Sequence, residues 1–502
     1  MDEENRQLIV MGNGFDLECG LKTKYQDFFD YRLGISLEKQ IIKRINPKAD
    51  EKEVTENFDQ LVKAKIRKYC TENFGGISGY VNVLGDTSDL PCAKNEKSDP
   101  NIVKQCRDIL NRYWDKLGKL ITRIEDQHVQ DELISKLNQI KDWQYNTWEA
   151  IFLIANTFIS SKSSIQWQDV ETMIFSIVTE LLTDSEKSVF DRYSFAEQGD
   201  ESYLLSALGN LYFKDSETDN KAIELLEELQ KFESNFAKYI NKIKDDAGEK
   251  YYNNASRLFD AILNSKRTNI IDVLSFNYSL DSSFIGPCKK MFDYIHDNQA
   301  SLEINSWSNI HGVATVKDEV SLDWLLSSGV KLLEKKNINI PAPIFGIDNH
   351  GILSPDNRQN GSSSEINLDD PRSIFTKSYR LIDNHVNEIR VKSFQDKVDV
   401  ITFFGHSLGH ADYSYFESIF DKYDIFHSNV KLEFYYYPGN KSDEAAAKRE
   451  ERKTIKNIVK LLTSYGETLE SEHGENIVNK LMLEQRLSVL PNPSFGAEEN
   501  NE

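Results

Sequence analysis

The sequence predicts an α/β fold in which a mostly parallel sheet is interrupted by a large all-helical insertion. The apolar run 8–11 ends in a glycine-rich turn, as a strand covered on both faces does. From about residue 50 to 265 the chain consists almost wholly of amphipathic helical stretches. Strand-like runs then return, separated by helical or loop segments, and this alternation predicts parallel neighbours.

The first strand leads into the turn Gly12-Asn13-Gly14. Glycine lets backbone N–H groups approach a ligand closely, and a helix starting after Asp16 would point its positive end at an anion. We therefore expect nucleotide phosphates at this turn. Leu17 stands where the dinucleotide fingerprint requires a third glycine, which disfavours an ordinary dehydrogenase. A tight turn without a ligand remains the alternative, and Asp16 could either cap the helix or contact a ribose hydroxyl.

The remaining elements follow from periodicity. Amphipathic helical stretches lie near 102–141, 145–160, 168–184, 219–245 and 249–266, and strand-like runs at 270–276, 342–346, 398–404 and 430–437. Residues 352–373 are rich in Ser, Asn, Asp and Gly and predict a long loop that could close over a site. We assign 1–50 plus 266–440 to a discontinuous α/β domain, 51–265 to the insertion, 441–488 to C-terminal helices and 489–502 to a disordered tail.

Composition restricts the partners of the protein. The 502 residues include 60 Lys and Arg against 81 Asp and Glu, and a net charge of −21 disfavours extensive binding to nucleic acid or anionic lipid. There is no long apolar run and no basic leader, so we expect a cytoplasmic protein without a membrane partner. The five cysteines are scattered and predict free thiols, and no histidine or cysteine spacing predicts a metal site.

Polar or glycine residues follow three of the later segments, where strands are expected to end. The segments are 276–279, with Asn277 and Ser279; 309–312, with His311; and 404–412, with Gly405, His406, Ser407, Leu408 and Asp412. The carboxyl ends of parallel strands meet at one edge of a sheet. We therefore expect these residues and the first glycine turn to surround one small-molecule nucleotide.

The motifs resemble those of the bacterial abortive-infection family AbiH. They are G-N-G-F-D at 12–16, G-L-x-T-x-Y ending at Tyr25, and F-G-H-S-L-x-x-x-D ending at Asp412. Further similar pieces lie at 167–171, 345–348 and 375–377. The resemblance spans nearly the whole chain apart from the insertion and the tail. It implies an antiphage effector that forms a homo-oligomer and responds to a phage trigger protein or a defence-system partner.

The same order of motifs is similar to the sirtuin-type NAD-binding domain, a Rossmann-like fold. Position by position, the matching residues are Gly12 and Gly14, then Asn277, then His311, and finally Gly405, Ser407 and Leu408. The resemblance implies that NAD is bound as a substrate and that Asn277 and His311 are catalytic. The residues implied to bind it are Gly12, Asn13, Gly14, Asp16, Tyr25, Ser279, Gly405, His406, Ser407, Leu408 and Asp412.

Two departures from the sirtuin pattern narrow the activity. Ser279 stands where sirtuins carry an aspartate that recognises nicotinamide, and the zinc-binding cysteine pairs of deacylases are absent. Hydrolysis of the N-glycosidic bond of NAD is therefore favoured over deacylation. A base of near-neutral pKa such as His311 could draw on a ribose hydroxyl or activate water. Asn277 could position the same groups without adding a charge.

Two other functions stay open at this point. The run 405–409 fits the G-x-S-x-G elbow of α/β-hydrolases, which would make Ser407 the nucleophile of an esterase, with Asp443 and His473 as partners. Alternatively, the chain could be a non-catalytic sensor that binds a nucleotide and signals through its helices. Asn277 and His311 would then be ordinary polar groups at strand ends.

Overall fold

A computed structural model describes most of the chain, and its contacts divide it into two compact units. The described residues are 4–50, 52–74, 102–143, 145–158, 170–182, 218–263, 268–297, 299–314, 343–347, 370–384, 393–409, 412–439, 443–469 and 474–496. The sheet unit comprises Met1–Thr23, Phe236–Gly351 and Thr376–Glu502, and the helical unit Lys24–Asn235 and Ile352–Phe375. Residues 24–50 thus group with the helices, and 236–263 with the sheet, whereas the predicted boundaries were at 50 and 265.

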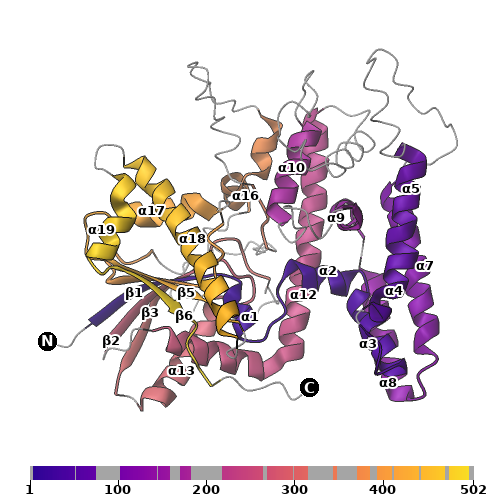
Figure 1. Ribbon diagram of the computed structural model, residues 1–502, viewed down its shortest axis with the longest axis horizontal. Coiled ribbons are helices and arrows are strands. Elements are labelled where there is room, and N and C mark those ends of the chain that lie inside the picture. Colours follow the sequence, from indigo (N-terminus) through magenta and orange to yellow (C-terminus); the bar gives the residue numbers. More distant parts are fainter. Residues whose placement is uncertain are drawn as a thin grey trace, which may run out of the picture. The chain divides into compact units, whose positions relative to one another are not determined.

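The sheet unit is built on six parallel strands in the order β3-β2-β1-β4-β5-β6 (Figure 1). They are β1 Glu4–Met11, β2 Thr268–Ser275, β3 Ser301–Asn309, β4 Val400–Phe404, β5 Lys431–Tyr436 and β6 Leu487–Pro491. The strand order reverses between β1 and β4, and sheets of this doubly wound kind bind ligands beyond the carboxyl ends of the strands at that point. The predicted α/β class with a parallel sheet is confirmed.

Helices cover both faces of this sheet. They are α1 Gly14–Glu18, the later part of α12 Thr218–Ala261, α13 Ile285–His296, α17 Tyr413–Lys422, α18 Glu444–Thr468 and α19 Ile477–Leu483. The same unit contains α16 Lys377–Asp383, which packs on Ile344 in a small separate cluster. Because side chains alternate along a strand, Leu8 and Val10 face a core formed with α17, α18 and α19. Ile9 and Met11 face the opposite core, formed with α12 and α13. Both faces of this part of the strand are therefore buried, which explains why residues 8–11 of β1 are apolar.

The helical unit is an assembly of helices, as the sequence predicts for its described residues. They are α2 Tyr25–Arg32, α3 Ile35–Ile45, α4 Glu56–Phe58, α5 Ala64–Phe74, α7 Ile102–Ile121, α8 Gln127–Asp142, α9 Thr147–Phe158, α10 Val170–Leu182 and the first part of α12, with short helical turns at Glu53–Thr55, Asp59–Lys63 and Pro371–Phe375. Within this unit Arg32 and Glu149 form a fully buried ion pair, with Nε 2.6 Å from Oε1. No helix among the described residues is long and apolar enough to span a membrane.

Three elements differ from the prediction. Of the expected strand 342–346, the described part 343–347 forms no strand and makes one bridge, from Ile347 to Thr376. Proline at 343 cannot donate to a strand ladder. Conversely, β3 and β6 were not predicted, because polar residues interrupt the first and the second is a short edge strand. Positions 352–369 of the predicted loop 352–373 lie outside the described residues.

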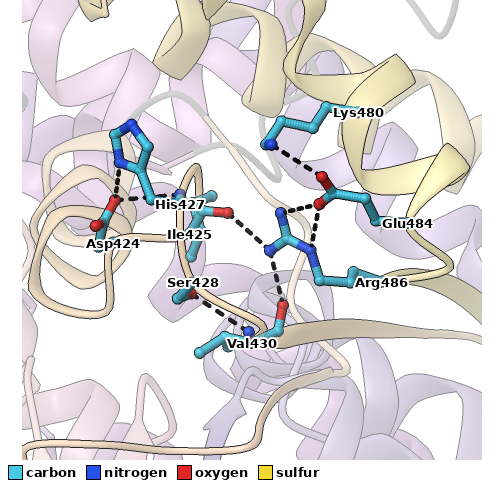
Figure 2. Close-up of polar contacts among 8 residues, drawn as sticks. All are labelled: Asp424, Ile425, His427, Ser428, Val430, Lys480, Glu484 and Arg486. Carbon is cyan, nitrogen blue, oxygen red and sulfur yellow. Dashed lines mark hydrogen bonds and ion pairs between the residues drawn. The ribbon is translucent and has the colours of Figure 1, made fainter.

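The expected disordered tail 489–502 is wrong at its start, because residues 489–491 belong to β6. Leu487 and Val489 pack against the sheet core. Figure 2 shows how Arg486, just before β6, is held: its Nη1 donates to the carbonyl oxygens of Ile425 and Val430, at 2.8 and 3.1 Å. These contacts join the starts of β5 and β6, at the sheet edge opposite the strand carboxyl ends.

Candidate functional site

The turns after β1 and β4 pack backbone against backbone at the point where the strand order reverses. The N–H of Gly12 donates to the carbonyl of Phe404 at 2.9 Å, and that of Gly14 to the carbonyl of Gly405 at 2.8 Å. A Cβ atom on Gly12 would lie 2.4 Å from the Cα of His406. These two amides are therefore occupied by protein carbonyls, which corrects the expectation that they bind phosphate. Asn13 and Ser407 are the exposed residues of the two turns.

Asn277 follows β2 and is buried with its side-chain amide unsatisfied. Its backbone N–H donates to the hydroxyl of Ser275 at 3.2 Å, and its carbonyl accepts from the amide of Asn309 at 3.2 Å. Neither Nδ2 nor Oδ1 of Asn277 has a hydrogen-bond partner among the described residues, although the residue is 2% exposed. A buried polar group without a partner is unusual enough to require an explanation.

His311 follows β3, the neighbouring strand, and is buried in an aromatic setting. Its ring packs edge-on to Phe276, with centroids 5.2 Å apart, and near Tyr415. Within the described part of the chain Nε2 makes no hydrogen bond. Burial above all, and then the charge of Lys377, lower the pKa of His311 from its ordinary 6.5 to about 3. The imidazole is therefore neutral at pH 7, which corrects the expectation of a base with a near-neutral pKa.

Asp412 directly precedes α17 and contacts three basic side chains, which come from α16, the turn after β4 and the segment after β3. The Nζ of Lys377, the first residue of α16, is 2.5 Å from Oδ1. The Nε2 atoms of His406 and His311 lie 3.3 Å from Oδ2 and 3.5 Å from Oδ1, respectively. Burial by itself raises the pKa of Asp412, but Lys377 and the two histidines outweigh it and hold this pKa well below its usual range. The carboxylate is consequently ionised.

The orientation of His406 is fixed from both sides of its ring. Its Nδ1 accepts the backbone N–H of Leu408 at 2.9 Å, so the proton of the neutral ring belongs on Nε2, which faces Asp412. Leu408 has a φ of 56°, which is strained for a leucine. Phe276 lies against the same ring, with centroids 4.5 Å apart. Phe276 thus contacts both His311 and His406.

A second polar cluster lies around Asp16 and is fully bonded. The hydroxyls of Tyr251 and Ser279 donate to Oδ1 and Oδ2 of Asp16 at 2.7 and 2.6 Å. The Nζ of Lys244 donates to the carbonyl of Ser279 at 2.7 Å. Burial, opposed by these hydrogen bonds, raises the pKa of Asp16 to about 6. Asp16 and Ser279 therefore bond to each other, and the side chain of Asp16 caps no helix.

A family comparison supplies the identity that this geometry alone does not. The model of a family described as "Bacteriophage abortive infection AbiH" matches residues 8–436, which is most of the chain. The protein belongs to the AbiH family. The resemblance drawn from the motifs is thereby confirmed, and the family suggests a role in phage abortive infection. No curated protein and no solved structure matches the chain.

The predicted site residues of this AbiH protein fall into distinct groups. His311, His406 and Asp412 gather beyond β3 and β4 and at the start of α17. Asn277 follows β2 beside Asn309, and Gly12, Gly14 and Gly405 form the packed turns. Tyr25 begins α2 in the helical unit. Sequence reasoning missed Lys377, Lys244 and Tyr251. The segment 375–377 was noted as similar to the family, but nothing in it indicated that Lys377 would pair with Asp412.

The esterase interpretation finds no support in the geometry of Ser407. Both ring nitrogens of the adjacent His406 face other groups, and no described histidine hydrogen-bonds the Ser407 hydroxyl. The predicted acid Asp443 caps α18 through the N–H of Ala446, and His473 lies outside the described residues.

Neither metal ligands nor cysteines add a further candidate site among the described residues. In the described ranges no group of three His, Cys, Asp or Glu side chains could hold a metal ion. Cys19 and Cys288 are free thiols, and both are buried, as is Cys106.

Proposed function

We propose that this AbiH protein binds NAD at the carboxyl edge of its sheet and hydrolyses the N-glycosidic bond, which would deprive an infected cell of NAD. One observation carries the proposal: the amide of Asn277 and Nε2 of His311 are buried and unsatisfied beyond two neighbouring strands. Leaving such a group unpaired costs about 1–3 kcal/mol. A ligand with several hydroxyl groups, such as the ribose next to nicotinamide, would supply the missing partners.

The strand order supports a dinucleotide rather than a smaller ligand. Doubly wound sheets in the order found here bind dinucleotides across the point where the order reverses. The motifs at 12–14, 277, 311 and 405–408 also occur in the order of the sirtuin-like domain. Because the amides of Gly12 and Gly14 are occupied, we assign the pyrophosphate to the exposed surface around Asn13 and Ser407.

The residues fit the demands of the reaction. The bond between C1′ of the ribose and the ring nitrogen of nicotinamide breaks, and nicotinamide leaves as a neutral molecule with the electron pair. Water then forms a bond to C1′ and releases a proton to solvent, giving ADP-ribose. Asn277 would hold a ribose hydroxyl or this water without adding charge. His311, as a neutral imidazole, would accept a hydrogen bond from a ribose hydroxyl, and the ionised Asp412 lies beside it.

The test measures cleavage and binding separately. Purified full-length protein is incubated with NAD, and nicotinamide and ADP-ribose are quantified by chromatography. Asn277→Ala and His311→Ala should each lower cleavage by about 10²–10⁴-fold, with the fold intact by circular dichroism. The matched controls are Asn476→Ala and His427→Ala, two exposed side chains remote from the strand carboxyl ends, and they should cleave like the parent.

A second measurement is made in cells, because the protein could require a phage trigger or self-association for activity. NAD is measured in phage-infected cells that carry the parent or Asn277→Ala; it should fall with the parent and persist with the variant. NAD binding without loss of NAD in either setting would identify a nucleotide sensor instead. Equal NAD loss with parent and variant would also refute the proposed chemistry.

A further inference from the structure

Lys377 and His311 face the same oxygen atom of Asp412. The ammonium of Lys377 lies 2.5 Å from Oδ1, whereas Nε2 of His311 lies 3.5 Å from it and makes no hydrogen bond among the described residues. The other carboxylate oxygen, Oδ2, is next to Nε2 of His406. The two acceptors of Asp412 thus have nearer partners than His311.

The position of Lys377 is set by its surroundings. Its side chain is 4% exposed, and its backbone N–H donates to the carbonyl of Ile347 at 3.0 Å. Gly346 packs so closely on it that an added Cβ would lie 2.9 Å from Cγ of Lys377. The hydroxyl of Thr376 caps α16 by accepting the N–H of Tyr379 at 3.3 Å. The buried ammonium of Lys377 is therefore held in a position where it pairs with Asp412.

We propose that Lys377 is a positioning residue: by occupying Oδ1 of Asp412, its ammonium keeps His311 uncharged and leaves Nε2 of His311 available to a ligand hydroxyl. Without the ammonium, Oδ1 of the buried Asp412 carboxylate would lose its partner at 2.5 Å, and Nε2 of His311 would lie 3.5 Å from that oxygen. His311 would then take up a proton and pair with Oδ1, as buried charges demand a partner. An imidazolium fixed on Asp412 could no longer accept a hydrogen bond from a ligand.

In the described part of the chain, the charged or titratable groups that affect His311 are Lys377 from α16, Asp412 before α17 and His406 from the turn after β4. Tyr415 from α17 contacts the ring. Burial, Lys377 and His406 lower the pKa of His311, and Asp412 alone among the charged groups raises it. Removing Lys377 therefore takes away one opposing charge and releases the one attracting charge.

The test observes the protonation of His311 directly, in the ligand-free protein. Histidine side chains are labelled with ¹³C at Cε1, His311 is assigned through His311→Gln, and its titration is followed by NMR. In the parent, His311 should stay neutral to the lowest pH at which the protein remains folded. In Lys377→Met its midpoint should rise by about 1–3 pH units, because Asp412 gains a free oxygen. Lys377→Arg, which keeps the charge, should behave like the parent.

The expected effect of Lys377 on NAD cleavage rests on the proposed function, because it requires that Nε2 of His311 contacts the ligand. The expected effect on the protonation of His311 does not. In Lys377→Met, NAD cleavage should fall and should fall further as the pH is lowered, unlike that of Lys377→Arg. Protonation of His311 in the parent near pH 6, or an unshifted midpoint in Lys377→Met, would overturn the role of Lys377. If Lys377→Met does not fold, Lys377→Gln gives the same titration. Absence of NAD cleavage by the parent would refute the proposed function and leave the titration valid.

Discussion

The two units of this protein each bury an ion pair, and the pairs differ in how completely they are bonded. In the helical unit, Arg32 bonds Glu149 and the carbonyl oxygens of Ile140 and Trp143, and Glu149 also accepts from Asn146. In the sheet unit, the pair of Lys377 and Asp412 lies beside Nε2 of His311, which has no hydrogen-bond partner within the described chain. A saturated pair fixes a core, whereas an incompletely bonded cluster has capacity left for a ligand.

The largest expected effect concerns the saturated pair. Arg32→Met leaves Glu149 as a buried carboxylate without a counter-charge and should lower the free energy of unfolding by about 3–5 kcal/mol in denaturant titrations. The control Lys141→Met breaks an ion pair with the largely exposed Asp115 and should cost about 0–1 kcal/mol.

Below about pH 5, Lys377→Met should cost less stability than Arg32→Met, because His311 can there replace the lost positive charge by taking up a proton. Equal losses for the two variants would remove the distinction between a structural pair and a ligand site.

A pH dependence of stability should arise from Asp16. Both of its carboxylate oxygens accept hydrogen bonds, and its pKa is raised above the ordinary value. Its pKa is about 6 in the folded protein and 3.8 ordinarily, so the folded protein holds this proton more tightly than the unfolded chain. The contribution is therefore fully present below pH 3.8 and is lost as the pH rises through 6, by about 3 kcal/mol in total. Asp16→Asn should remove this slope from unfolding curves measured across the same range; an unchanged slope would assign it to other groups.

The smallest effect separates close packing from backbone strain at the turns. Gly405 and Gly439 have similar φ values, 69° and 72°, but a Cβ on Gly405 would lie 2.5 Å from the backbone N of Phe15, and one on Gly439 meets nothing within 4 Å. Gly439→Ala should therefore cost about 1–2 kcal/mol from strain alone. Gly405→Ala should cost about 1–3 kcal/mol more, measured by the same unfolding titration. Equal costs would show that the two turns can move apart.

The local sequence predicted the strands correctly where a continuous apolar run ends in glycine or polar residues. The apolar run before Gly12 is a central strand, the runs near 270 and 400 are its parallel neighbours, and the run near 431 pairs with the latter. Side chains after strands were expected to meet at one edge, and Asn277 and His311 follow adjacent strands. By contrast, the run of β3 was missed because its polar positions hide the alternation, although a strand end was expected near 309, and β6 was missed because it is a short edge strand. The pairing of both strands comes from neighbours distant in the chain.

The sequence by itself determined the α/β class, the membership of the AbiH family and the edge of the sheet where polar residues gather, because strand patterns and motifs are local. Only the tertiary structure decided how the atoms of that edge are used. The N–H groups of Gly12 and Gly14 donate to Phe404 at the end of β4 and to Gly405 just after it. Asp16 bonds Ser279, and Lys377 pairs with the Asp412 oxygen that His311 faces. Hydrogen-bond partners and the pKa of a buried group depend on atoms brought together from remote positions, and no local pattern specifies them.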